Sequence, residues 1–171
     1  MTTTPVPDSV LTDFANMSAA LTGFQPSFLR PFLDPVNLSG TYYDFAVSQV
    51  SQQGMDALLD AYRAIAAQPP QTIANTLLET GSTAPSNQAQ IAQSIVALWY
   101  FGSWYKPAYQ NGGVPSAVVQ VVSSQAYTNG LVWQVAQAHP MGFSAFTFGY
   151  WSQPPASLAT FGVNVPDGGG Q

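Results

Sequence analysis

The sequence is short of charge and contains no cysteine. Only 6% of its 171 residues are Asp, Glu, Lys or Arg, against about 25% in an ordinary soluble domain. Three basic residues against eight acidic ones give a net charge of −5, which argues against nucleic-acid binding because phosphates must be neutralised by Lys and Arg. Without cysteine the chain forms no disulfide, thiolate metal site or cysteine nucleophile, although this absence does not identify a compartment.

Long hydrophobic runs are also missing. Gln, Ser or Gly interrupts every apolar stretch before it reaches the roughly 20 residues that span a bilayer. The first ten residues, MTTTPVPDSV, have neither a basic n-region nor an apolar h-region, so we do not expect them to act as a signal peptide as they stand.

Residues that carry catalysis are scarce as well. His139 is the only histidine, and no Gly-x-Ser-x-Gly motif accompanies it, so a catalytic triad is formally possible but a loop histidine bonded to backbone is the simpler interpretation. Eight scattered carboxylates form no recognisable metal-ligand spacing. Asp56 and Asp60 lie one helical turn apart beside Arg63, which is typical of a solvated helix face. We therefore expect no catalytic residues, no metal ligands and no cofactor bound by this chain.

Helical periodicity is what the sequence does contain, and it predicts an all-α, single-domain helical bundle. The strongest segment is 88–105, where Ile91, Ile95, Leu98 and Gly102 recur at steps of three and four. Lys106-Pro107 is expected to end this helix, because Pro disfavours helix in the preceding residue.

Other helices are predicted from caps and breakers. Thr41 and Asp44 resemble a capping box, Gly54 is expected to end or kink the helix that follows, and Ser123 is the N-cap candidate for a last helix. Val118 to Val122 are expected to be extended or helical. The predicted helices cover residues 8–22, 42–54, 55–67, 71–79 and the segment through Tyr127, Leu131 and Val135.

The sequence divides into four parts of one domain. Residues 1–7 are predicted to be a flexible arm, 8–137 the helical body, 138–160 an irregular aromatic segment that wraps against a core or a partner, and 161–171 a frayed tail. The aromatic share of 13% is high beside so few charges. Either another protein covers much of the surface, or uncharged polar side chains solvate it.

Three segments carry a family resemblance: ALWYFGSWY (97–105), VVSSQAYTNGLVW (121–133) and AHPMGFSAFTFGYWSQPP (138–155). Their order, with the Trp-Tyr-x-Gly and Gly-Tyr-Trp-x-x-Pro-Pro patterns, resembles the small (gamma) subunit of bacterial membrane-bound FAD-dependent sugar and sugar-alcohol dehydrogenases. That family includes the small subunits of D-sorbitol, fructose and FAD-dependent glucose dehydrogenases. The likeness covers roughly residues 8–155 in outline and is specific only in the last part.

The resemblance implies a non-catalytic subunit. Its partner would be a large flavoprotein of the glucose-methanol-choline type that carries FAD and oxidises the sugar, with electrons leaving through an iron-sulfur cluster or a multihaem cytochrome. The small subunit would stabilise its partner and assist its maturation and twin-arginine export, in a periplasmic complex peripheral to the inner membrane. The start at MTTTPVP departs from the family pattern; either a signal was removed or export works otherwise.

By position in these motifs, nine residues are predicted to lie at or behind the large-subunit contact: Trp99, Tyr100, Trp104, Tyr105, Trp133, His139, Pro140, Tyr150 and Trp151. Two alternatives stay open, a stand-alone helical enzyme that uses His139 and a self-associating structural or binding domain. An enzyme would act alone, whereas a subunit would be inert alone and rescued by its partner.

Overall fold

The computed structural model describes residues 5–105, 120–138 and 140, and it confirms the all-α prediction. Only two short strands interrupt the helices of the described part. β1 (Ser103–Trp104) pairs antiparallel with β2 (Gln120–Val121), with Ser103 opposite Val121. The helices are α1 (Asp8–Thr22), α2 (Pro26–Leu29), α3 (Leu38–Ile65), α4 (Pro70–Leu78), α5 (Asn87–Phe101), α6 (Ser124–Thr128) and α7 (Leu131–Val135).

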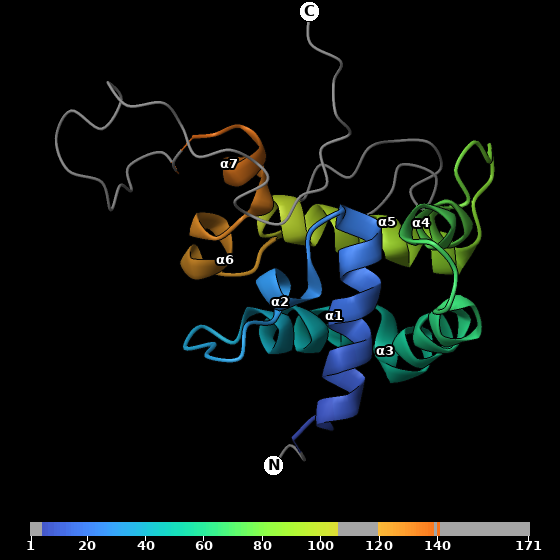
Figure 1. Cartoon of the computed structure of the whole chain (residues 1–171), viewed down its shortest axis with the longest axis horizontal. Helices are drawn as coiled ribbons and strands as arrows, with labels where there is room; N and C mark the ends of the chain where they lie inside the picture. Colours follow the sequence, from blue (N-terminus) through green and yellow to red (C-terminus); the bar gives the residue numbers. More distant parts are fainter. Residues whose placement is uncertain (1–4, 106–119, 139, 141–171) are drawn as a thin grey trace, which may run out of the picture.

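One core joins the long helices. α1 packs against α3, α4 and α5, while α6 and α7 lie toward one end of α5 (Figure 1). Aromatic rings fill the centre: Phe14 of α1 meets Tyr43 edge-on at 5.6 Å between ring centroids, and Tyr42 meets Trp99 edge-on at 4.8 Å. Such perpendicular pairs suit the charge distribution of aromatic rings and add to the burial energy.

α5 has the predicted buried face but a different end. Ile91, Ile95 and Leu98 are buried, and the Ser86 hydroxyl caps the start by accepting a hydrogen bond from the Ala89 N–H. The prediction that the helix continues to Tyr105 is wrong, because Gly102 adopts the left-handed conformation (φ 63°) and its N–H donates to the Leu98 carbonyl. A glycine C-cap of this kind ends a helix before any proline is needed.

α3 also corrects the sequence-based boundaries. It begins at Leu38 rather than near Tyr42, and the Thr41 hydroxyl donates to the Asn37 carbonyl instead of forming a capping box. The interruption falls at Ser51 (φ 71°, ψ 162°) rather than at Gly54. Glycine is a common helix breaker, but Gly54 has helical neighbours on both sides, and a Cβ on it would make only an ordinary contact with Val50 at 3.5 Å.

The last predicted helix is divided into α6 and α7. Ser123 caps α6 as expected, since its hydroxyl accepts from the Ala126 N–H. The chain then breaks at Asn129 and Gly130, where a Cβ on Gly130 would come within 2.7 Å of the Tyr100 carbonyl oxygen. This close approach holds α7 against the C-terminal end of α5.

The remaining helix ends lie within two residues of the prediction, the largest difference being the end of α3 at Ile65 rather than at residue 67. α1 ends at the left-handed Gly23, as expected, and α4 starts at Pro70 instead of Gln71. No helix in residues 5–105 and 120–138 is long and apolar enough to cross a membrane. The predicted aromatic segment beyond Pro140 and the tail 161–171 lie outside the described residues.

Candidate functional site

The predicted contact residues fall into three groups. Trp99 and Trp104 belong to the core, at 2% and 4% exposure. Tyr100 and Trp133 are partly buried and hydrogen-bonded: the Tyr100 hydroxyl donates to the Thr22 carbonyl at 3.0 Å, and the Trp133 indole N–H donates to the Tyr127 carbonyl at 2.7 Å. Trp99 and Trp104 are therefore core residues, whereas Tyr100 and Trp133 keep part of their side chains at the surface.

Among the described aromatic residues of the predicted set, Tyr105 is the most exposed. Its ring packs against Phe101 at a centroid distance of 5.9 Å, and both rings are more than one-third exposed. The Ser94 hydroxyl donates to the Tyr105 carbonyl at 2.7 Å, which fixes the backbone beside the pair. Pro140 is buried, whereas His139, Tyr150 and Trp151 lie outside the described residues.

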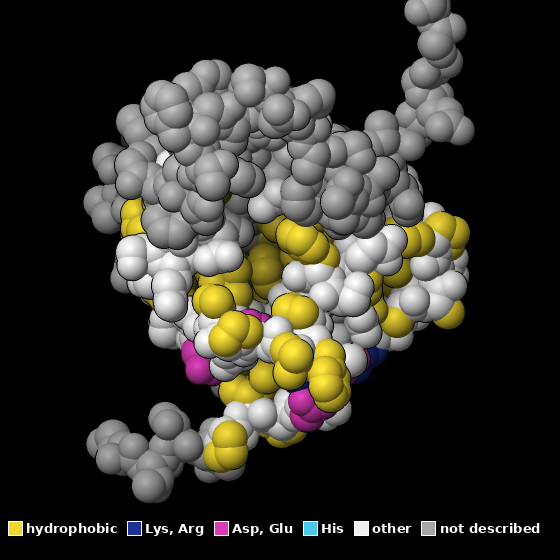
Figure 2. All heavy atoms as spheres, turned by 60° about the vertical axis from the view of Figure 1, so that its left-hand side comes forward, with side chains coloured by type: hydrophobic (Ala, Val, Ile, Leu, Met, Phe, Trp, Pro, Cys, Tyr) yellow, Lys and Arg dark blue, Asp and Glu magenta, His cyan; other side chains and the backbone are white. Residues whose placement is uncertain are grey.

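A second apolar surface was not predicted from the sequence. Phe32 and Leu33 follow α2 in the loop that leads to α3, at 102% and 81% exposure. Figure 2, which brings this side of the molecule forward, shows hydrophobic side chains gathered on it with few charged groups among them. The sequence feature that could have indicated this surface is the segment FQPSFLRPFL (24–33). Its prolines at 26 and 31 prevent a single helix from forming and burying all of its apolar residues.

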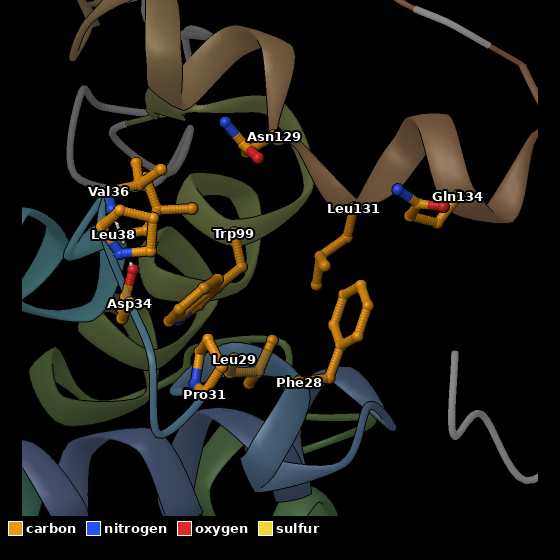
Figure 3. A pocket seen from close by; sticks show the side chains of 11 residues that line it. Phe28, Leu29, Pro31, Asp34, Val36, Leu38, Trp99, Asn129, Leu131 and Gln134 are labelled. Atoms are coloured by element: carbon orange, nitrogen blue, oxygen red, sulfur yellow. Dashed lines mark hydrogen bonds between the residues drawn. The ribbon is translucent and has the colours of Figure 1, made fainter. Parts of the chain in front are cut away.

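A pocket of about 200 Å³ opens beside this loop, between α2, the 31–38 segment, α5 and α7. In Figure 3 the indole of Trp99 lies between Leu38 on one side and Leu131 on the other. The Trp99 Nε1–H is buried and has no hydrogen-bond partner among the described residues. Buried polar groups normally have a partner, so this donor is an unsatisfied group of the core, and its nitrogen has less than 1 Å² of accessible surface.

Electrostatic effects at titratable groups follow from burial and local hydrogen bonds. Burial raises the pKa of Tyr42, and it also raises that of Tyr100. Hydrogen bonding from the Ser86 side chain and then from its backbone N–H lowers the pKa of Glu79. Tyr42, Tyr100 and Glu79 do not line the pocket, although the Tyr42 ring packs against Trp99, which does. Burial and local hydrogen bonds account for all three pKa shifts.

Charged side chains form surface contacts. Arg63 bonds to Asp13 and Asp60 at 2.7 and 2.8 Å, and Asp56 accepts from the Gln52 amide, as expected of a solvated helix face. Across the part of the chain that the structure describes, no three His, Cys, Asp or Glu side chains gather where they could hold a metal ion.

Comparison with known proteins does not assign the chain to a family. No protein-family model matches the sequence, and no match is found among curated proteins or solved structures. Within the described residues, the candidate sites are the surface around Phe32 and Leu33, the Phe101/Tyr105 pair, and the pocket beside the 31–38 loop.

Proposed function

We propose that the chain is the non-catalytic small subunit of a bacterial FAD-dependent sugar or sugar-alcohol dehydrogenase complex. The observation that carries this proposal is the exposure of Phe32, Leu33 and the Phe101/Tyr105 pair on a chain with 6% charged residues. Large apolar side chains that stay exposed mark surfaces for protein contact. The motif resemblance in residues 97–105 and 121–133 supplies the kind of partner.

The partner is a large flavoprotein subunit that carries FAD and oxidises the sugar. This chain binds no cofactor of its own; it stabilises the large subunit and assists its maturation and export. Electrons leave the flavoprotein through a multihaem cytochrome or an iron-sulfur element of the complex. The complex works in the periplasm, peripheral to the inner membrane.

The Phe101/Tyr105 pair is the proposed centre of the contact. Aromatic side chains bury a large area at an interface while the tyrosine hydroxyl keeps a polar end. The pair lies on a firm base, because Trp104 packs against Phe45 at 6.3 Å between centroids and the backbone at Tyr105 is held by Ser94. A rigid base lowers the entropy lost on binding.

The decisive experiment is co-expression with a candidate FAD-containing large subunit of the glucose-methanol-choline type. Size-exclusion chromatography and a dye-reduction assay with sugar and sugar-alcohol substrates are run with and without this chain. We expect co-elution and flavin-loaded activity that depends on the small chain. A lone monomer with no effect on candidate partners would contradict the proposal, and substrate turnover by this chain alone would favour an enzyme using His139.

A double variant locates the contact. Replacing both Phe101 and Tyr105 by Ser should weaken the complex on the order of 1,000-fold, since a central aromatic residue contributes about 2 kcal/mol or more and two such losses make about 4 kcal/mol. Gln68→Ser is the matched control, because Gln68 is exposed and polar. Unchanged affinity in the double variant would move the contact to another surface.

A further inference from the structure

Phe32 and Leu33 form the tip of the loop between α2 and α3, and both side chains point into solvent, at 102% and 81% exposure. Pro31 and Pro35 flank this loop tip, and proline fixes its own φ angle. The Asp34 Oδ1 accepts hydrogen bonds from two backbone N–H groups of the loop, at 3.2 and 2.7 Å. These local restraints limit the shapes of the loop tip, which lowers the entropy lost when a partner binds.

The pocket adjoins the loop tip, because Pro31 and Asp34 belong both to the loop and to the described lining. On the side away from Asp34, Leu131 and Phe28 point toward one another in Figure 3. The volume of about 200 Å³ is comparable to that of the roughly 150 Å³ apolar cavity that binds benzene. The pocket therefore has the size and the apolar walls to hold one phenyl ring.

The loop tip and the pocket make this face complementary to itself. Phe32 does not fill the pocket of its own copy, since its side chain is fully exposed. A two-fold axis between the projecting ring and the pocket lets each of two copies insert Phe32 into the other. Such an isologous contact closes after two copies and does not continue into a filament.

The charge of this face permits the approach of a second copy. Segment 26–38 contains one basic residue, Arg30, and one acidic residue, Asp34, so its net charge is zero although the whole chain carries −5. Arg30 is already paired with Asp8. Two copies therefore meet here without the like-charge repulsion that disfavours wrong partners.

The contact area is that of a weak dimer. A buried aromatic side chain removes about 150–250 Å² from water, so Phe32 and Leu33 together remove roughly 300 Å² per copy. The facing walls lose a similar area, and the two halves together bury roughly 1,200 Å², the low end for a specific interface.

We propose that this face binds a second copy of the chain, with Phe32 of each copy in the pocket of the other. The contact uses residues other than the Phe101/Tyr105 pair. It does not depend on the proposed subunit function, and its failure would leave that function untouched.

The first test is sedimentation velocity of the full chain over a range of concentrations. We expect a monomer–dimer equilibrium with a Kd on the order of 10 µM and no larger species. Phe32→Ser removes the ring, and Val36→Trp fills the pocket from its partly buried wall. Each variant should weaken the dimer about tenfold or more, and circular dichroism should show that both keep the native helix content.

Matched controls place the same substitutions outside this face. Phe101→Ser and Val121→Trp change side chains that are 47% and 55% exposed and outside the described pocket lining. Both variants should form the dimer with the native Kd.

A mixing experiment then pairs the ring with the pocket directly. The Phe32→Ser variant keeps an open pocket, whereas the Val36→Trp variant keeps the ring. Adding unlabelled Val36→Trp to ¹⁵N-labelled Phe32→Ser should shift the backbone signals of Leu131 and Gln134, which line the pocket. The Kd should be on the order of 1 mM, because one of the two ring insertions is restored. The Phe32→Ser/Val36→Trp double variant, added in the same way, should cause no shift.

Three results would overturn the proposal. The native chain could stay monomeric at about 100 µM, well above the expected Kd, or associate beyond a dimer. The double variant could shift the pocket signals as strongly as Val36→Trp does. A monomer that sediments with phosphatidylcholine vesicles, and loses this binding in Phe32→Ser, would assign the loop tip to a lipid surface instead.

Discussion

Gly102 and Gly23 end two helices in the same left-handed conformation, but their surroundings differ. Gly102 (φ 63°) is so close to α6 that a Cβ would meet the Ala126 carbonyl carbon at 2.4 Å, whereas nothing lies within 4 Å of a Cβ on Gly23 (φ 82°). Alanine at Gly23 should therefore cost about 1 kcal/mol, the conformational penalty alone. Alanine at Gly102 should cost about 3 kcal/mol or more, because the backbone of α6 must move.

Urea unfolding of the two variants measures this difference. The comparison is matched, since both changes add one methyl group to a left-handed C-cap. Equal losses of unfolding free energy would mean that α6 does not pack on Gly102 as described.

Tyr42 predicts a pH dependence of stability. Its ring is fully buried and burial raises the pKa of its phenol, while the hydroxyl makes only a long 3.4 Å hydrogen bond to the Ala126 carbonyl. Below about pH 10 both the folded and unfolded states keep the proton. As the pH rises through that value, the unfolded state ionises first, so the free energy of unfolding should fall.

Tyr42→Phe isolates this contribution. At neutral pH the free energy of unfolding of the variant should be lower by about 1 kcal/mol or less, because the lost hydrogen bond is weak. Above about pH 10 this free energy should decline less steeply in the variant than in the native chain. Part of the decline should remain, since burial also raises the pKa of Tyr62 and Tyr100. Denaturation midpoints measured from neutral to alkaline pH provide the check, and identical slopes would contradict the role of Tyr42.

At the scale of the element, α3 contains a strained residue. Ser51 occupies φ 71° and ψ 162°, a region that is essentially restricted to glycine. Its hydroxyl accepts only a 3.4 Å bond from the Gly54 N–H, and glycine replaces such a cap at a cost of a few tenths of a kcal/mol. Ser51→Gly should therefore raise the unfolding free energy by about 1 kcal/mol.

Ser48→Gly is the control within the same helix. Ser48 is exposed and lies in the regular part of α3, where glycine lowers stability by roughly 0.5 kcal/mol relative to serine. Thermal and urea unfolding of the pair should give changes of opposite sign. A loss of stability in both variants would show that Ser51 is not strained.

The elements also show what the sequence was able to predict. Helix faces followed from periodicity, because Ile91, Ile95 and Leu98 recur at helical spacing and all three are buried. Caps that use local contacts, such as Ser123 and Gly23, were also found. These features depend on residues a few positions apart, which a sequence displays directly.

Features that depend on distant contacts were missed. Gly102 ends α5 where Ala126 packs closely against it, and Gly130 divides the last helix where the chain meets Tyr100. Ser51 adopts a backbone conformation that serine rarely adopts, so its sequence gives no sign of the break in α3. Glycine is the commoner helix breaker, and the break was therefore predicted at Gly54. The exposure of Phe32 and Leu33 was not predicted either, because the burial of a side chain depends on contacts made across the whole fold.

At the scale of the whole molecule, burial and not charge stabilises the fold. The ion pairs Arg30–Asp8, Arg63–Asp13 and Arg63–Asp60 involve exposed or partly exposed side chains. Such pairs contribute about 0 to 1 kcal/mol each and weaken in salt. The exposed surface has few charges to keep copies of the chain apart, which makes its apolar side chains the main determinants of association.

The last prediction concerns self-association of the chain without a partner. Replacing Phe32 and Leu33 by Ser should reduce light scattering and the oligomer fraction in sedimentation velocity, because both side chains are exposed and apolar. The unfolding free energy should change by no more than about 0.5 kcal/mol, as expected for surface positions. Gln68→Ser, an exposed polar change, should leave association unaltered. If the double variant associates as strongly as the native chain at unchanged stability, the contact between copies lies elsewhere, and the Phe101/Tyr105 pair becomes the surface to substitute next.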